Sequence, residues 1–501
     1  MFCLPWRAFA SALVCLALVA CSKQHTVSAL EREPLCRDCN VILISMDTVR
    51  ADHVGAYGYE RQTTPNVDAL AARSVLFENA VSQASWTLPA HGSMMTGLYP
   101  ARLGVIHYPA KRKLPDNVDT LALTLSRAGY TTAGFTGGGF VSSHFGFDRG
   151  FETYASGGRR FEHNIDEALT WLEQNKNRRF FLFFHGYDAH RPYYSHPMDK
   201  EAIGLRSKGQ VEKRNFCNRS RRDRPSAVEL ATILGFYDAS IHMGDRIVGR
   251  LLDALQKKGL MKNTVILLTA DHGEEFFDHG NCDHVRFVYR EIVHVPLIVY
   301  VPGLTPDGER IPDVVPASLS VSRTLLDLVG VEHDMPGVTL VPVLRGQHEL
   351  FGAVFSEADS IAGALGSRGA TIAMTSDHYK LISYLEEGAD EAYDAIEDPT
   401  EHHILPESHD AYAARRTLRA WHASVEPSPS DVAVARAPVR EPAKDGKPAA
   451  ARVDAKARPD KPGQRVAKDA AKRGAAKKPE EKLELPKKLQ DELRSLGYLD
   501  E

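Results

Sequence analysis

Short, nearly uninterrupted apolar runs recur through the first 300 residues of the chain. Runs of this length and composition are typical of strands that are buried on both faces of a parallel sheet. They lie at residues 40–46, 180–185, 265–270 and 297–301, and a further strand-like run lies at residues 131–136. Between them the apolar residues recur three or four apart, as from residue 228 to residue 255. We therefore predict an α/β fold with a mostly parallel central sheet flanked by helices.

The pattern changes after about residue 352, where short strand-like pieces at 371–375 and 380–384 replace the alternation of strands and helices. We predict a main domain over residues 39–352 and a small C-terminal subdomain over residues 353–424. A linker over residues 22–38 precedes the main domain.

A basic tail follows the predicted subdomain. Residues 431–480 hold 14 Lys and Arg against 7 Asp and Glu, with no Phe, Trp, Tyr, Leu, Ile or Met. Such a segment cannot bury enough apolar surface to offset the entropy of ordering it, so we predict disorder over residues 425–482. A solvated spacer is the favoured interpretation, although nucleic acid, anionic lipid or a polyanionic cell wall could also attract it. Apolar periodicity returns over residues 483–501, which predicts a final helix that packs back onto the body.

The N-terminus has the pattern of a targeting segment. Arg7 precedes an apolar stretch, residues 8–20, that is too short to span a membrane as a mature helix. The stretch ends in Leu-Val-Ala-Cys, which resembles a bacterial lipobox ending at Cys21. We expect residues 1–21 to direct export and Cys21 to carry lipid, which predicts an envelope protein that faces the periplasm or the cell surface. A plain signal peptide cut after Ala20 and an uncleaved anchor are the alternatives.

Export would leave four further cysteines in an oxidising compartment, enough for two disulfides. Cys36 and Cys39 form a Cys-x-x-Cys pair directly before the first predicted strand. Zinc would need a second pair, so we interpret these two as a local disulfide or as free thiols.

The most informative stretch for function is residues 85–97, Ser-Trp-Thr-Leu-Pro-Ala-His-Gly-Ser-Met-Met-Thr-Gly. It resembles the nucleophile turn of the sulfatase family, Cys-x-Pro-Ser-Arg-x-x-x-x-Thr-Gly. Thr87 stands where that family has the Cys or Ser that is oxidised to formylglycine, and His91 stands where it has Arg. Pro89 suits the first turn of a helix over residues 89–98, which places Thr87 at an anion-favouring helix N-terminus. The resemblance implies that Thr87 is the nucleophile and that His91 orients it; an ordinary helix cap is the alternative.

Two further motifs follow predicted strands, at the sheet edge where α/β proteins gather function. Asp47-Thr48 follows the first strand, and Asp271-His272-Gly273-Glu274 follows the strand at 265–270. Both resemble metal-binding turns of the sulfatases and of the wider alkaline phosphatase superfamily, although Thr48 replaces a frequent second Asp. The resemblance implies a divalent metal ion held by Asp47, Asp271 and His272, with Thr48 at the fourth position. Calcium, magnesium, manganese and zinc all remain open. Asp52 matches an Asp in relatives but could equally pair locally.

Two histidines complete the resemblance. His190 belongs to a His-x-Pro-Tyr motif whose His contacts the ester oxygens or the leaving group in relatives, so it is the candidate general acid. His284 lies near the place where relatives put a Lys or His on the ester oxygens. His185 and Asp188 are possible helpers or ligands. A surface loop with incidental histidines is the alternative.

Residues 208–224 form a strongly basic insertion that contains Cys217 and could face an anionic substrate. A solvated loop is an equally good interpretation. We hypothesise that Cys217 pairs with Cys282, beside His284, and so ties this loop to the site.

Threonine alters the expected chemistry. A formylglycine hydrate has two hydroxyls, one to attack sulfur and one to expel sulfate, whereas threonine has only one. Water would have to clear a sulfo-threonine by attack at sulfur, which is harder than clearing a phospho-threonine. The family favours sulfate esters, whereas the threonine favours phosphoryl transfer.

The resemblance covers about residues 39–420 and includes Tyr393-Asp394 and Asp398-Pro399-Thr400-Glu401, which are similar to a signature of the sulfatases' C-terminal antiparallel subdomain. We therefore interpret the chain as a lipid-anchored, metal-dependent hydrolase of sulfate or phosphate esters with an alkaline-phosphatase-like fold. The substrate would be a sulfated or phosphorylated glycan, lipid or small molecule, and no specific nucleic acid is expected. The alternatives are a phosphodiesterase, a phosphoryl or sulfuryl transferase, a degenerate protein that binds anionic glycans without catalysis, and an envelope spacer that acts through its basic tail.

Overall fold

The computed structural model describes residues 33–108, 110, 112–206, 217, 224–347, 351–360, 369–425 and 485–496. The predicted targeting segment, the predicted tail and most of the basic insertion lie outside these residues. No helix within the described ranges is both long and apolar enough to cross a membrane.

The core of the molecule is a sheet of eight strands in the order β11-β2-β10-β7-β1-β6-β4-β5. The strands are β1 (Asn40–Met46), β2 (Val75–Val81), β4 (Thr131–Thr136), β5 (Thr153–Ser156), β6 (Phe180–Gly186), β7 (Thr264–Thr269), β10 (Leu297–Tyr300) and β11 (Glu309–Pro316). Neighbouring strands are parallel except at β10, which is antiparallel to both β2 and β7. The predicted fold class is therefore confirmed.

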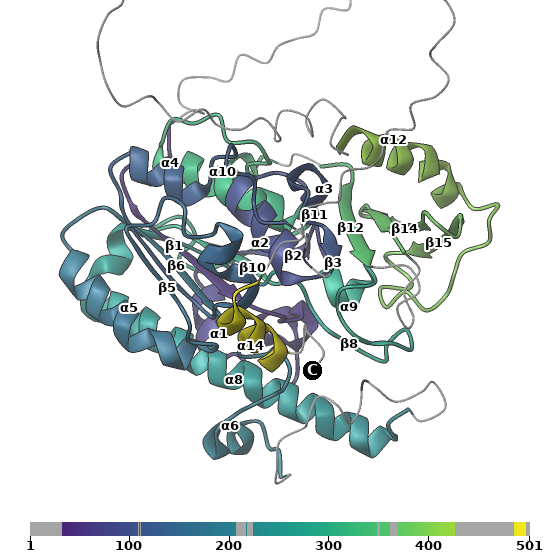
Figure 1. Cartoon of the computed structure of the whole chain (residues 1–501), viewed down its shortest axis with the longest axis horizontal. Coiled ribbons are helices and arrows are strands. Elements are labelled where there is room, and N and C mark those ends of the chain that lie inside the picture. The colour runs from purple at the N-terminus through teal and green to yellow at the C-terminus, as the bar shows by residue number, and fades with distance from the viewer. Residues whose placement is uncertain are drawn as a thin grey trace, which may run out of the picture.

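Helices cover both faces of this sheet. The longer ones are α1 (Pro65–Ala71), α2 (Thr87–Thr96), α4 (Leu121–Arg127), α5 (Phe161–Asn175), α8 (Ala227–Lys257) and α10 (Ala317–Val329). Figure 1 shows α5 and α8 on one face and α2, α4 and α10 on the other. Short helical turns are η2 (Ala51–His53), η3 (Gly55–Tyr57), α3 (Pro100–Leu103), η4 (Gly139–Val141), η5 (Ser143–Phe145), α6 (Pro197–Ala202), η6 (Leu260–Asn263), α9 (Arg290–Val293) and α11 (Val341–Leu344).

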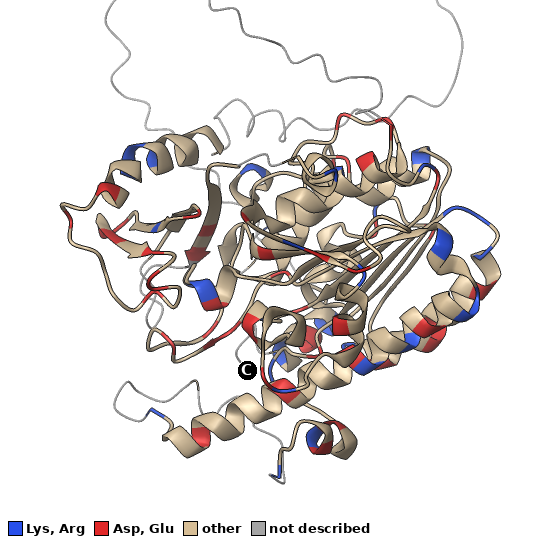
Figure 2. Cartoon of the chain, turned by 180° about the vertical axis from the view of Figure 1, so that it is seen from behind, with Lys and Arg blue, Asp and Glu red and all other residues tan. Residues whose placement is uncertain are grey.

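The three central strands explain why the sheet forms where it does. All residues of β1, β6 and β7 are buried, which is the environment that their apolar runs require. Figure 2 shows charged residues along the outer helices, including the long α8, whereas the strands of the sheet carry few. Ser45 pairs in register with His185 on one side and with Thr269 on the other. The side chains that follow these strands therefore emerge at one level of the same edge.

A second, smaller sheet lies beside the first in the order β15-β14-β13-β12-β3. Its strands are β3 (His107–Tyr108), β12 (Val354–Ser360), β13 (Thr371–Thr375), β14 (Tyr379–Tyr384) and β15 (Ala389–Asp394). The last four are mutually antiparallel, and η7 (Asp410–Ala414) and α12 (Arg415–Val425) pack against them. A two-stranded ribbon, β8 (Glu275–Phe276) and β9 (Cys282–Asp283), follows β7.

A buried polar contact joins the ribbon to the second sheet. The His279 Nδ1 atom lies 2.8 Å from Glu291 Oε1, and its Nε2 atom lies 2.8 Å from the carbonyl oxygen of Glu401. The ring stacks on Tyr289 with the centroids 3.8 Å apart. Lys380, on β14, donates to both carboxylate oxygens of Glu401 at 2.9 and 3.0 Å. The ribbon and the second sheet are thus held together by charged groups that are almost entirely shielded from water.

The last described element is α14 (Lys487–Ser495). Its Leu489 and Leu493, together with Leu496 just beyond it, are buried in the main core. Figure 1 shows this gold-coloured helix lying against the body of the main domain rather than beside the second sheet.

Candidate active site

The site begins at the carboxyl end of β1. Asp47 is fully buried, and the hydroxyl of Thr48 donates to its Oδ1 atom at 2.5 Å. Thr48 has a positive φ of 63°, a conformation that a β-branched residue adopts only under constraint. This backbone turn directs the Thr48 N–H toward Oδ1 of Asp271, 3.1 Å away. The strained turn therefore fixes two carboxylates against each other.

Asp271 and His272 follow β7 at the same edge. Oδ1 of Asp271 accepts from the N–H of His272 at 2.9 Å, whereas its Oδ2 atom has no hydrogen-bond donor among the described residues. The Nδ1 atom of His272 lies 2.9 Å from the carbonyl oxygen of Gly273, so Nδ1 carries the proton. The lone pair of Nε2 then points into the site, where Nε2 lies 3.3 Å from Oδ2 of Asp271.

These residues fit a divalent cation. Burial raises the pKa of Asp47, and burial and the Asp47 charge raise the pKa of Asp271. Two negative charges that are close together and shielded from water destabilise each other. A cation bound between them would remove that cost. Oxygen atoms of Asp47 and Asp271 and a nitrogen of His272 all lie within 4.8 Å of one another. Carboxylate oxygen with neutral imidazole is a donor set for calcium, magnesium, manganese or zinc.

Thr87 is brought to this cluster by α2. Its hydroxyl oxygen lies 3.4 Å from Oδ2 of Asp47 and 3.4 Å from Nε2 of His272. The helix begins at Thr87 itself, two residues before the predicted start, because Pro89 is tolerated in the first turn. Every residue of α2 is buried, so the hydroxyl has a fixed position.

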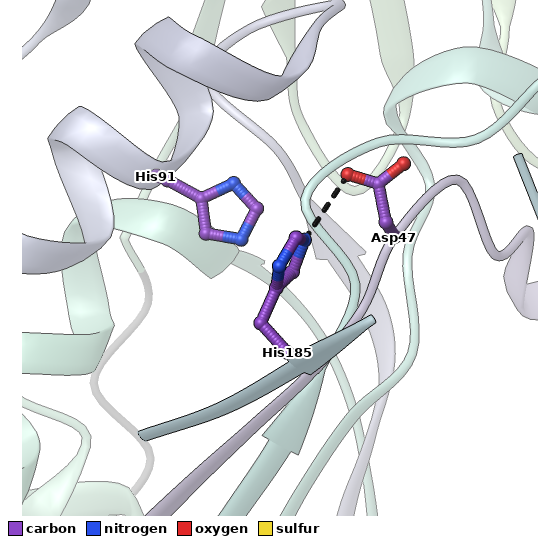
Figure 3. A group of neighbouring side chains, drawn as sticks. All are labelled: Asp47, His91 and His185. Carbon is purple, nitrogen blue, oxygen red and sulfur yellow. Dashed lines mark hydrogen bonds and ion pairs between the residues drawn. The ribbon is translucent and has the colours of Figure 1, made fainter. Parts of the chain in front are cut away.

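His91 and His185 lie on one side of Asp47, and a nitrogen of His185 faces the Asp47 carboxylate (Figure 3). Burial lowers the pKa of His91 to about 3 and that of His185 to about 4, so both rings are neutral. His91 Nδ1 lies 3.0 Å from the carbonyl oxygen of Thr87 and therefore carries the proton, while Nε2 lies 2.9 Å from the Ser45 hydroxyl.

The tautomer of His185 is fixed in the same way. Its Nδ1 atom accepts from the N–H of Gly137 at 3.2 Å, so Nε2 carries the proton and lies 3.4 Å from Oδ2 of Asp47. Asp47, His91 and His185 are close enough to hold a metal ion. Their hydrogen bonds leave neither ring a nitrogen lone pair for it. His91 bonds instead to the carbonyl oxygen of Thr87, and His185 to the carboxylate of Asp47.

His190 and His284 are neighbours in the candidate site. Their ring centroids are 5.1 Å apart, and the His284 ring lies 4.3 Å from that of His272. His284 Nδ1 lies 3.0 Å from Oε1 of Glu274. Burial alone would lower the pKa of His284, but the Glu274 and Asp283 carboxylates outweigh it and the pKa is raised. The structure thus brings His284 beside His272, a predicted ligand, and His190 beside His284.

Two other residues considered from the sequence have local partners. Asp188 accepts at 2.9 Å from the N–H of Phe161 in the first turn of α5, and burial raises its pKa to about 7. Asp52 pairs with Arg50 at 2.8 Å, which is the local pairing given above as its alternative.

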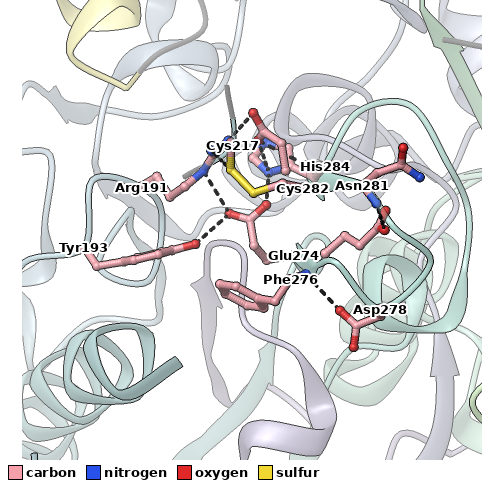
Figure 4. Close-up of a disulfide and its surroundings, with 11 residues drawn as sticks. Arg191, Tyr193, Cys217, Glu274, Phe276, Asp278, Asn281, Cys282 and His284 are labelled. Atoms are coloured by element: carbon pink, nitrogen blue, oxygen red, sulfur yellow. Dashed lines mark hydrogen bonds and ion pairs between the residues drawn. A yellow bond between two sulfur atoms is a disulfide. The ribbon is translucent and has the colours of Figure 1, made fainter. Parts of the chain in front are cut away.

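Sequence reasoning missed the support around His284, which Figure 4 shows. Arg191 is a buried cation that lies 3.5 Å from Oε2 of Glu274 and pairs with Asp283. The hydroxyl of Tyr193 donates to the same Oε2 atom at 3.2 Å. The signal was present, because Arg191 and Tyr193 belong to the His-x-Pro-Tyr motif and Glu274 follows Asp271-His272-Gly273.

A disulfide between Cys217 and Cys282 lies beside this network, as hypothesised, and ties the insertion to the strand that precedes His284. Cys36 and Cys39 are also joined, which decides between the two states left open for that pair.

Comparison with known proteins gives matches over most of these elements. A family model described as Sulfatase matches residues 39–331, and one described as N-sulphoglucosamine sulphohydrolase, C-terminal, matches residues 277–423. The chain is 25% identical over 407 residues to a Delta 4,5-hexuronate-2-O-sulfatase of Bacteroides thetaiotaomicron, a match that covers 72% of this chain and 83% of that protein.

Solved structures agree on the fold. A structure described as a complex with its substrate D-glucosamine-2-N,6-O-disulfate matches with a TM-score of 0.62 at 20% identity, over 78% of this chain and 99% of the other. The phosphonate monoester hydrolase of Agrobacterium radiobacter matches with a TM-score of 0.60 at 21% identity, over 79% and 96% of the two chains.

Proposed function

Because the chain belongs to the sulfatase family, we propose that it is a metal-dependent ester hydrolase of that family in which Thr87 is the nucleophile. The observation that carries the proposal is the position of the Thr87 hydroxyl, 3.4 Å from both Asp47 and His272. That position suits an oxygen that attacks an ester bound to the same cation as these two side chains.

Asp47, Asp271 and His272 would hold the cation, and Thr48 supports Asp47. When bound, a divalent cation would lower the pKa of the Thr87 hydroxyl and balance the charge of the ester oxygens. Its identity stays open among calcium, magnesium, manganese and zinc.

Four side chains would carry out the proton transfers and balance the charge in this reaction. The Thr87 hydroxyl passes its proton to the Asp47 carboxylate that it faces, and its oxygen bonds to phosphorus or sulfur as the bond to the leaving oxygen breaks. His190 donates a proton to that leaving oxygen. In the second step water attacks the same centre, His190 takes a proton from the water, and Thr87 leaves with the proton held by Asp47. His284, whose pKa the Glu274 and Asp283 carboxylates raise, would balance the charge of the ester oxygens.

The threonine favours a phosphate monoester or diester over a sulfate ester, because water clears a phospho-threonine more readily than a sulfo-threonine. Similarity to a hexuronate sulfatase supports a sulfated glycan instead, and the fold shared with a phosphonate monoester hydrolase is compatible with phosphoryl chemistry. A transferase would use the same residues, with an acceptor hydroxyl in place of water. Lipid on Cys21 would keep the enzyme at the membrane of the cell envelope.

The test is hydrolysis of an aryl sulfate, an aryl phosphate and an aryl phosphodiester by residues 22–501, each with calcium, magnesium, manganese or zinc. Thr87→Ala is the matched inactive variant. Phosphoester turnover that this variant lacks supports the phosphoryl proposal, and sulfate turnover that it lacks assigns a sulfatase that works with threonine. Absence of turnover on every ester would favour a protein that binds anionic glycans without catalysis.

A further inference from the structure

Helix α14 is separated from the rest of the described chain by the basic segment 426–484, yet it lies against the loops that carry the candidate active site. Its leucines are buried in the main core, with Leu493 fully inaccessible and Leu496 only 2% exposed. The contact is therefore an integral part of the fold, and its polar groups have fixed partners.

The first contact is with the loop after β4. Glu492 Oε2 accepts from the N–H of Gly139 at 3.3 Å. Gly138 and Gly139 both have positive φ angles, and a Cβ atom at Gly139 would lie 2.8 Å from Leu496 Cδ1. The helix thus occupies space that side chains of this loop would otherwise fill. The same loop holds His185 through Gly137.

The second contact reaches the loop of the candidate general acid. One guanidinium nitrogen of Arg159 donates to the carbonyl oxygen of Ser495 at 2.8 Å, and another donates to the carbonyl oxygen of Arg191 at 2.6 Å. That Arg191 carbonyl also accepts from Nδ1 of His190 at 2.8 Å. The Arg159 guanidinium therefore links Ser495, at the end of α14, to the Arg191 carbonyl oxygen that binds the His190 ring.

We propose that α14 is a positioning element of the active site. Arg159 couples the position of the Ser495 carbonyl to the orientation of the His190 ring. This inference rests on the proposed function, because it concerns the proton that His190 gives to the leaving oxygen. With Ser495 in place, Arg159 is held at both ends and the Arg191 carbonyl keeps Nδ1 of His190 protonated, so Nε2 is the atom that exchanges protons with the ester. Without α14, Arg159 loses its hydrogen bond to Ser495, and the guanidinium can shift together with the Arg191 carbonyl that it binds.

The experiment compares two esters of the class that the wild-type protein hydrolyses, one with a 4-nitrophenyl leaving group and one with a phenyl leaving group. Protonation matters little for 4-nitrophenolate and greatly for phenolate. We expect Arg159→Gln to lower kcat on the phenyl ester by roughly tenfold and kcat on the 4-nitrophenyl ester by less than about twofold. Arg159→Lys should recover part of the loss, since it keeps a donor. Arg494→Gln, on the exposed side of α14, is the matched control and should match the wild type on both esters.

Two further variants separate positioning from folding. In the full chain, Leu493→Ala, which weakens the packing of α14 against the main core, should show the same preference for the better leaving group as Arg159→Gln. In a His190→Asn background, Arg159→Gln should cause no further loss on either ester. An equal loss on both esters, or a full further loss in the His190→Asn background, would overturn the inference while leaving Thr87 as nucleophile. Turnover that survives Thr87→Ala, or no turnover by the wild type, would instead remove the proposed function and this inference with it.

Discussion

The Nε2 atom of His91 lies 2.9 Å from the hydroxyl of Ser45, a residue of β1 two positions before Asp47. Its Nδ1 atom lies 3.0 Å from the carbonyl oxygen of Thr87. One neutral imidazole thus joins the strand that presents a candidate metal ligand to the helix that presents the candidate nucleophile.

His91→Phe should reduce both stability and activity, because it keeps an aromatic ring of similar size but leaves the Ser45 hydroxyl buried without its partner. We expect a loss of about 1–3 kcal/mol in the free energy of unfolding, measured by urea denaturation, and a lower kcat. Ser45→Ala removes the same contact from the other side and should cost less, since it leaves only the Nε2 atom of His91 without its partner, whereas His91→Phe removes the partner of both the Ser45 hydroxyl and the Thr87 carbonyl. The double variant should cost no more than His91→Phe alone; additive losses would show that the two side chains do not act together.

Thr87→Ser should retain hydrolysis, whereas Thr87→Ala should lower kcat by a factor of about 1,000 or more, because only the hydroxyl can attack. The measurement is steady-state turnover of the best ester, with circular dichroism to show that both variants are folded. Trapping of a phosphorylated or sulfated protein by acid quench, followed by mass spectrometry, should locate the modification on the peptide that contains residue 87. Modification of a different peptide would contradict the assignment.

Asp271→Asn should lower the bound divalent metal by at least ~10-fold, measured by mass spectrometry of the dialysed protein, because Asp271 has an unsatisfied oxygen facing the site. Added metal should raise the Tm of the wild type and not that of the variant. Asp188→Asn is the control, since Asp188 is also buried but is bonded to the first turn of α5. Equal metal content in both variants would mean that the cation binds at a site that does not include Asp271.

Loss of the Cys217–Cys282 disulfide should reduce activity more than loss of the Cys36–Cys39 disulfide. The first closes a separation of 65 residues next to His284 and Arg191, and the second closes a separation of three. Chain-entropy arguments give about 4 kcal/mol for the long loop and about 2 kcal/mol for the short one. Paired Cys→Ser variants, compared by Tm and by kcat, test this order; a reversed order would mean that the long-range bond does not support the site.

Stability should fall between pH 6.5 and about 9 through His279. Burial alone would lower the pKa of this ring, but its hydrogen bond and charge interaction with Glu291 and its contact with Glu401 outweigh burial and raise the pKa to about 9. A pKa that is higher in the folded state stabilises the fold fully below the unfolded value of about 6.5, and the gain is lost as pH rises through 9. The difference in Tm between wild type and His279→Gln should therefore shrink over this range. A difference that stays constant would show that the ring is neutral throughout.

The sheet and the main site motifs could be predicted because their signals are local. β1, β6 and β7 are nearly continuous apolar runs, and the polar residues that follow them had to meet at one edge. The antiparallel direction of β10 could not be predicted, because direction depends on the path of the connection and not on the run of apolar residues itself. The support that Arg191 gives Glu274 was also missed, since their contact joins residues 83 positions apart and depends on tertiary packing. The tautomers of His91 and His185 likewise depend on which backbone groups face each ring.

The bond between Arg159 and Ser495 spans the chain from its first third to residue 495. A polypeptide that ends before that residue, because synthesis stopped or a protease cut it, offers Arg159 no carbonyl there. Each molecule that has this bond was therefore translated past residue 495 and has α14 packed against the main core.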